Sequence, residues 1–111
     1  MSTLSTHVLD AAAGLPAAGV RVTLDRRDRN GWQPLGEAVT DGDGRVRDLA
    51  PGGLGVGVHR LVFATGDYFA ATGQTGFYPE VPVVFDVTDP GRHYHVPLLL
   101  SPFAFSTYRG S

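Results

Sequence analysis

The stretch Gly19-Val20-Arg21-Val22-Thr23-Leu24-Asp25 alternates apolar and polar side chains without a break. Successive side chains of an extended strand point to opposite faces, so this pattern predicts one face against a core and one face in water. Shortly after it, Asp28-Arg29-Asn30-Gly31 places an Asn-Gly pair between two apolar segments, which is the strongest short-range signal of a hairpin. We therefore expect a strand that begins near Gly19, a tight turn, and a returning strand from Trp32 to Val39.

Similar period-two patterns, separated by turn residues, recur along the rest of the chain. They predict further strands over residues 4–10, 45–47, 58–65, 77–87, 92–101 and 104–108. Pro79 and Pro82 remove backbone donors from the 77–87 segment, which favours a sheet edge or a bulge. One short helix is predicted over residues 66–73, with Asp67 capping its first amides and Gly73 ending it. The expected fold is all-β, an antiparallel β-sandwich of seven to eight strands with one short helix.

Length and composition exclude several classes of protein. With 111 residues, about two-thirds of the surface can be buried on folding, so we expect a single domain over residues 1–111. The sequence has no Cys and its nine basic residues are all Arg, which excludes thiol and Schiff-base chemistry. A net charge of −2 disfavours nucleic-acid binding. No secretory signal pattern and no membrane-spanning apolar run is present, so we expect a cytoplasmic protein with no nucleic-acid or membrane partner.

The histidines are the first candidates for chemistry. His93 and His95 share one face of a predicted strand, with their Cα atoms roughly 6.6 Å apart. This spacing leaves three interpretations open: two metal ligands, two acid–base groups, or a solvated strand face. The absence of Cys and the presence of only two Glu disfavour a metal site, and we predict neither metal nor cofactor. His59 shares a face with Leu61 and Phe63, which is typical of a hydrogen-bonded core histidine.

Other candidates are ambiguous when taken singly. His7 lies in the middle of a predicted strand, where a lone histidine is more often structural. Arg45 follows a Gly-rich turn and would either hold an anionic substrate or solvate a loop. The segment Tyr108-Arg109-Gly110-Ser111 puts an aromatic ring and a cation directly after a strand. Residue types alone predict a β-sandwich and leave open whether these side chains form a site.

Three motifs together resemble the transthyretin-like 5-hydroxyisourate hydrolase family. They are Leu4-Ser5-Thr6-His7-Val8-Leu9-Asp10, Thr40-Asp41-Gly42-Asp43-Gly44-Arg45, and His93-Tyr94-His95-Val96-Pro97-Leu98-Leu99-Leu100-Ser101-Pro102 leading into Ser106-Thr107-Tyr108-Arg109-Gly110-Ser111. The resemblance implies the transthyretin-like fold. It also implies catalytic roles for His7, Arg45, His95 and Ser111, and substrate binding by Tyr108, Arg109 and Gly110. The sequence departs from the family pattern at His59, where an aromatic is expected, and in the Gly-rich loop 49–56.

The resemblance further implies hydrolysis of 5-hydroxyisourate to 2-oxo-4-hydroxy-4-carboxy-5-ureidoimidazoline in urate (purine) degradation, without a cofactor. Histidine-assisted water attack would open the ring, with either His7 or His95 as the base. Family members are homotetramers, dimers of dimers, with sites at the dimer–dimer interface. Two alternatives remain at this point: a non-catalytic transthyretin-like carrier of a small molecule, and a structural or adhesion sandwich without a ligand.

Overall fold

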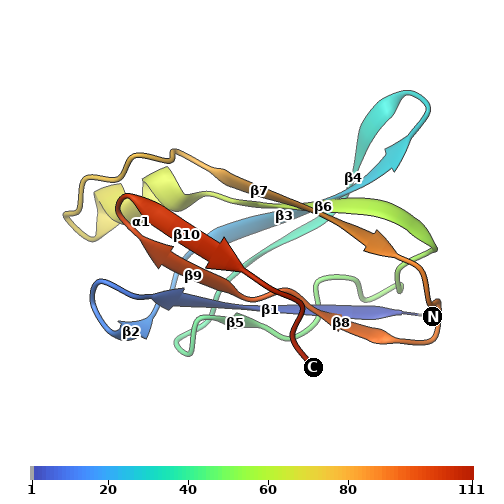
Figure 1. Cartoon of the computed structure of the whole chain (residues 1–111), viewed down its shortest axis with the longest axis horizontal. Coiled ribbons are helices and arrows are strands. Elements are labelled where there is room, and N and C mark those ends of the chain that lie inside the picture. The colour runs from blue at the N-terminus through green and yellow to red at the C-terminus, as the bar shows by residue number, and fades with distance from the viewer. Residues whose placement is uncertain (1) are drawn as a thin grey trace.

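The computed structural model describes residues 2–111 as two β-sheets facing one another, with a short helix near one end (Figure 1). The elements, in chain order, are β1 (Thr3–Asp10), β2 (Leu15–Pro16), β3 (Arg21–Asp28), β4 (Gly31–Val39), β5 (Arg45–Val46), β6 (Gly57–Phe63), α1 (Thr65–Ala71), β7 (Val81–Val87), β8 (His93–His95), β9 (Leu98–Ser101) and β10 (Ala104–Thr107). The all-β sandwich with one short helix is confirmed.

One sheet has the strand order β4-β3-β6-β7 and is antiparallel throughout. The predicted hairpin joins β3 to β4, with Asp28 paired to Gly31. The positive φ of the turn region lies at Gly31, the first residue of β4, where φ is 107°, and not at Arg29 or Asn30. β7 lies at the sheet edge, as expected from its prolines, although it starts at Val81 rather than at residue 77. Pro79 stays in the preceding loop, where its carbonyl oxygen accepts the Gly66 amide at 2.8 Å.

The second sheet is built around β1, which pairs with β2, β5, β8 and β9. The sequence predicted one strand over residues 92–101 in an antiparallel fold. Instead, β8 and β9 are separated at Val96-Pro97, and both run parallel to β1. The parallel register places Ser5 beside His95, and the Val96 amide donates to the Ser5 carbonyl oxygen at 3.0 Å. β1 is therefore the strand that brings distant parts of the sequence together.

The core lies between the two sheets and is formed by the inward-facing members of each alternating pattern. On β3 the buried residues are Val22 and Leu24, with Val20 just before the strand, while Thr23 and Asp25 are only partly buried. Fully buried partners from the other elements include Leu4, Val8, Leu61, Phe63, Leu98 and Leu100. Burial of a side chain of this size stabilises a fold by about 1.5–3 kcal/mol. Packing of the inward-facing side chains therefore fixes the strands in place and keeps their polar side chains on the outer face.

The helix α1 differs from the prediction at its start. Its N-cap is Ala64, which makes no side-chain capping bond, and Asp67 lies within the first turn. Its end was predicted correctly, because Gly73 with φ +73° follows it. Tyr68 of α1 donates its hydroxyl hydrogen to the Asp10 carboxylate at 2.7 Å, which ties the helix to the end of β1. Within residues 2–111 no helix is long and apolar enough to cross a membrane.

His59 lies in the core, as predicted, and takes no part in the site described below. Its side chain is fully buried, its Nδ1 lies 3.0 Å from the Gly57 carbonyl oxygen, and its ring stacks on Phe85. Its Nε2 has no hydrogen-bond partner among residues 2–111. Burial lowers the pKa of His59, and the positive charge of Arg26 lowers it further. The folded protein therefore favours the neutral imidazole.

This burial predicts a pH-dependent stability. As pH falls through about 6.5, the unfolded chain binds a proton at His59 more readily than the folded chain, so the free energy of unfolding decreases. We expect His59→Phe to remove on the order of 1 kcal/mol of that decrease between about pH 7 and about pH 5. Urea unfolding of both proteins at the two pH values measures it. Parallel losses of stability in the two proteins would show that His59 is not the titrating group.

Candidate active site

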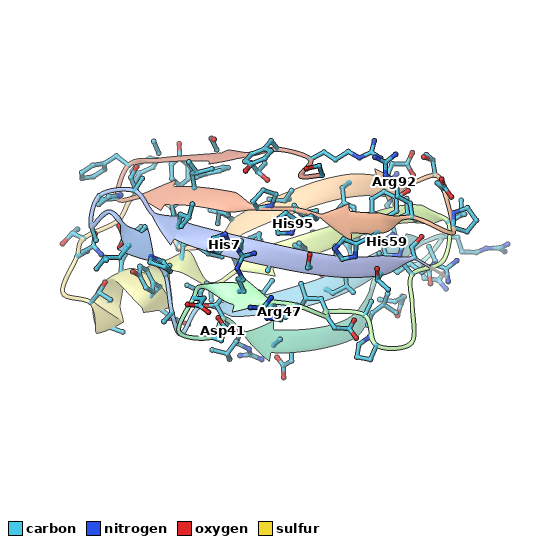
Figure 2. All side chains as sticks on the ribbon, turned by 90° about the horizontal axis from the view of Figure 1, so that it is seen from below. His7, Asp41, Arg47, His59, Arg92 and His95 are labelled. Carbon is cyan, nitrogen blue, oxygen red and sulfur yellow. The ribbon has the colours of Figure 1, made fainter. Side chains whose placement is uncertain are left out.

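Two cross-strand pairs meet on the outward face of β1. Ser5 and His7 are two residues apart on this strand, so their side chains share a face. His7 pairs with Arg45 of β5 on one side of β1, and Ser5 pairs with His95 of β8 on the other. All four residues are half-buried, and Figure 2 shows His7 and His95 on this sheet. The fold thus brings two imidazoles and one guanidinium from three sequence motifs onto one face.

The turn before β5 holds Arg45 beside His7. The Asp41 carboxylate accepts the backbone N–H groups of Asp43 at 2.9 Å and of Arg45 at 3.0 Å. These bonds, that from Arg45 first, hold the pKa of Asp41 below its ordinary value. Gly44 has φ +73°, and a Cβ there would overlap the Val8 carbonyl oxygen. Only glycine therefore lets this turn approach β1 closely enough for Arg45 to reach the face.

His95 is held by a side-chain hydrogen bond and lies near several positively charged or titratable groups. Its Nδ1 lies 2.8 Å from the Ser5 hydroxyl oxygen. Burial lowers the pKa of His95, and the charges of Arg45, His93 and His7 lower it further. Neutral imidazole therefore predominates near pH 7, which leaves a ring nitrogen free to accept a proton.

The C-terminal segment lies against His95. The Gly110 amide donates to the His95 carbonyl oxygen at 2.8 Å in an isolated antiparallel bridge. A Cβ on Gly110 would overlap the His95 ring at Cδ2. Glycine is required at this position because the backbone passes directly over the edge of the imidazole.

We expect Gly110→Ala to open this bridge. The added methyl must displace either the tail or the His95 ring, so the amide of residue 110 loses a hydrogen bond worth roughly 0.5–1.5 kcal/mol. Its hydrogen-exchange rate should rise about two- to tenfold. Gly52→Ala is the matched control, because a Cβ there meets nothing within 4 Å. Unchanged protection at residue 110 would contradict this account of the tail.

The other tail residues line a neighbouring cavity or are exposed. Tyr108 and Arg109 line a cavity of about 290 Å³ together with His95, Tyr94 and Phe85. The Arg109 guanidinium lies 5.7 Å from the centroid of the Tyr94 ring. Ser111 is exposed, and no hydrogen bond joins it to His7 or His95 within residues 2–111. The structure therefore brings His7, Arg45, His95 and Gly110 together, and puts Tyr108 and Arg109 on an adjoining cavity.

Sequence reasoning missed the residues that hold this site in place. It gave no role to Ser5 or Asp41, and it left His93 open as a metal ligand, an acid–base group or a solvated residue. The two-residue spacing of Ser5 and His7 was a signal, but its value depends on the parallel register of β8, which no local pattern reveals. Across residues 2–111 no three His, Asp or Glu side chains gather as metal ligands.

Known proteins resemble this chain over nearly its whole length. The 5-hydroxyisourate hydrolase of Caulobacter vibrioides is 50% identical over 115 residues, which cover 100% of both chains. That of Mus musculus is 45% identical over 99% of this chain and 96% of its own. The structure of Klebsiella pneumoniae 5-hydroxyisourate hydrolase matches with a TM-score of 0.90 at 38% identity, over 100% of both chains.

A transthyretin has an equally similar fold. Sea bream transthyretin in complex with thyroxine also matches with a TM-score of 0.90, at 34% identity over 96% of this chain and 93% of that one. The family model described as "HIUase/Transthyretin family" matches residues 4–110. This chain therefore belongs to the HIUase/Transthyretin family.

Proposed function

We propose that this chain is a 5-hydroxyisourate hydrolase, a single domain over residues 1–111 that opens the six-membered ring of its substrate with water. One observation carries the proposal: His7, Arg45 and His95 share a half-buried face, where a proton acceptor and a fixed cation lie side by side. Relatives that are 45% and 50% identical to this chain bear the name of this activity.

The histidines activate water and return the proton. Water is a poor nucleophile at neutral pH, whereas a neutral imidazole accepts its proton as the oxygen attacks the ring carbonyl carbon. The C–N bond then breaks, the leaving nitrogen takes the proton back, and a carboxylate remains on 2-oxo-4-hydroxy-4-carboxy-5-ureidoimidazoline. The lowered pKa of His95 supports this role because it keeps the ring neutral. His7, two strand positions from Ser5, shares the task.

Arg45 stabilises the negative charge that forms on the carbonyl oxygen. A guanidinium that is held in place before the reaction stabilises such charge better than mobile water does. The Asp41 turn and the pairing of Arg45 with His7 support this role, since both restrict where the cation lies. No cofactor enters the reaction.

The tail orients the planar substrate. Gly110 passes over His95, and Tyr108 and Arg109 line the adjoining cavity, so both the ring and the guanidinium lie within reach of a ligand beside His95. Ser111, which bonds neither His7 nor His95 within residues 2–111, would complete the catalytic set by orienting a histidine in the assembled protein. Holding the reacting groups in place in this way lowers the activation free energy, because their translational and rotational entropy is lost on binding and not in the reaction step.

The working form is a homotetramer, a dimer of dimers whose sites lie at the dimer–dimer interface. β7 and β10 are edge strands that pair on one side only among the strands of residues 2–111, and pairing across a two-fold axis would satisfy their outer backbone groups. A second dimer would then cover the His7 and His95 face and exclude bulk water. We place the protein in the cytoplasm and its reaction in the degradation of urate.

A transthyretin-like carrier is the second candidate, favoured by the match to the thyroxine-bound sea bream structure. A carrier of an apolar aromatic ligand needs an apolar channel, whereas this face holds His7, Arg45 and His95. The enzymatic proposal is therefore preferred.

The test is a direct assay with freshly generated 5-hydroxyisourate, followed by ultraviolet absorbance, with thyroxine binding measured in parallel. The proposal predicts ring opening well above the rate in buffer, and weak or no thyroxine binding. Tight thyroxine binding with ring opening at the buffer rate would overturn it in favour of a carrier.

A further inference from the structure

Three polar side chains behind His95 have no role in the proposed ring opening. The Ser5 hydroxyl oxygen lies 2.8 Å from His95 Nδ1 and also 2.8 Å from His93 Nε2. The Thr3 hydroxyl oxygen lies 2.5 Å from His93 Nδ1. The parallel register that pairs Thr3 with His93 and Ser5 with His95 creates this row. It is a continuous chain of hydrogen bonds from an exposed threonine to the half-buried His95.

The number of hydrogen atoms available limits how this row of hydrogen bonds can be arranged. A serine hydroxyl has one hydrogen, so Ser5 donates to one histidine and must accept from the other. When both rings are neutral, only two arrangements satisfy every bond between them. In the first, His95 donates from Nδ1 to Ser5, Ser5 donates to His93 Nε2, and His93 donates from Nδ1 to Thr3. In the second, all three bonds are reversed.

The two arrangements give His95 opposite abilities at Nε2. In the first, Nδ1 carries the hydrogen and Nε2 is a free acceptor, which is the form that a general base requires. In the second, Nε2 carries the hydrogen and is a donor. The tautomer that His95 presents is thus coupled, through Ser5, to the tautomer of His93.

The surroundings also favour moving a positive charge away from His95. His95 is half-buried, and Arg45, His93 and His7 are the charged or titratable groups that act on it. His93 is exposed at the end of the sheet, where water stabilises an imidazolium. Ser5 therefore connects a half-buried ring to one that water reaches.

We propose that Ser5 and His93 form a proton relay behind His95, which sets its tautomer and lets His93 hold the proton that His95 takes from water. This inference rests on the proposed hydrolysis for its catalytic part. Ser5 and His93 are positioning residues in it, because they act on the reaction only through His95.

The relay conserves protons. As water attacks, His95 gains a proton at Nε2 and gives its Nδ1 proton to Ser5, while Ser5 gives its own to His93 Nε2. His93 is then the cation and His95 is neutral. When the leaving nitrogen takes the Nε2 proton, the transfers reverse, and both histidines return to their starting forms.

Kinetics of four variants test the relay. Ser5→Ala breaks the chain and His93→Gln keeps an amide that can bond to Ser5 but cannot hold a proton. Both should lower kcat roughly tenfold and change KM less than about twofold. A tenfold loss is part of the rate factor of about 10² to 10⁴ that a positioned acid–base group supplies. Ser5→Thr restores a hydroxyl and should recover most of kcat. Ser101→Ala is the matched control, since that hydroxyl bonds only the Ala104 carbonyl oxygen among residues 2–111.

A kcat within about twofold of the parent for folded Ser5→Ala or folded His93→Gln would overturn the relay. Histidine ¹⁵N NMR of the free protein supplies a readout that needs no turnover. We expect the His95 tautomer to change as His93 is titrated, and this linkage to vanish in Ser5→Ala. Independent titration of the two rings in the parent would also overturn the relay. If the parent shows the linkage but does not open 5-hydroxyisourate, the hydrolase proposal fails while the hydrogen-bond coupling stands.

Discussion

Replacement of His95 by Ala is expected to lower kcat for ring opening by about 10²- to 10⁴-fold, and His7→Ala by a similar factor. The reason is that each change removes a proton acceptor from the face where water must be activated, while the core behind β1 and β8 is untouched. The measurement is the initial rate at saturating substrate, followed by absorbance.

His59→Phe is the matched control for these variants, because His59 is a buried histidine outside the site. It should keep kcat near the parent value at neutral pH. Rates near the parent for His7→Ala and His95→Ala in folded, assembled protein would remove both histidines from the mechanism.

Arg45→Gln is expected to lower kcat by about 10²- to 10³-fold, the usual loss when one donor to a developing oxyanion is removed. Glutamine can still donate a hydrogen bond but carries no charge, so the loss measures the cation itself. Arg45→Lys should recover only part of the rate, because an ammonium lacks the planar fork of a guanidinium.

Arg29→Gln is the control for charge, since Arg29 is exposed in the turn between β3 and β4, away from β1. It should leave kcat unchanged. An Arg45→Gln variant that raises KM while keeping kcat would instead assign this arginine to substrate binding alone.

Local patterns predicted the parts of the fold that local physics determines. The alternation through Val22 and Leu24 fixed which face is buried, and Asn30-Gly31 located the hairpin. The parallel pairing of β1 with β8 and β9 was not predicted, because register between strands about 90 residues apart leaves no mark on either strand. Asp67 has a side chain suited to an N-cap, but the helix begins at Thr65, two residues before Asp67, and its N-cap is Ala64.

The site likewise has parts that sequence motifs predicted and parts that depend on the fold. His7, Arg45 and His95 came from motifs, and their proximity came only from the pairing around β1. The positions of Arg109 over Tyr94 and of Gly110 over His95 follow from how the chain turns after β10, which composition does not encode. Ser5 and His93 acquire a role only when both flank His95, so their contribution was invisible before the register was known.

A crystal structure of the assembled protein with a stable, planar analogue of 5-hydroxyisourate tests the central claim most directly. We predict that the analogue lies over the outward face of β1, within hydrogen-bonding distance of His95, His7 and the Arg45 guanidinium. An analogue bound elsewhere, with these three side chains facing open solvent in every copy, would contradict the account.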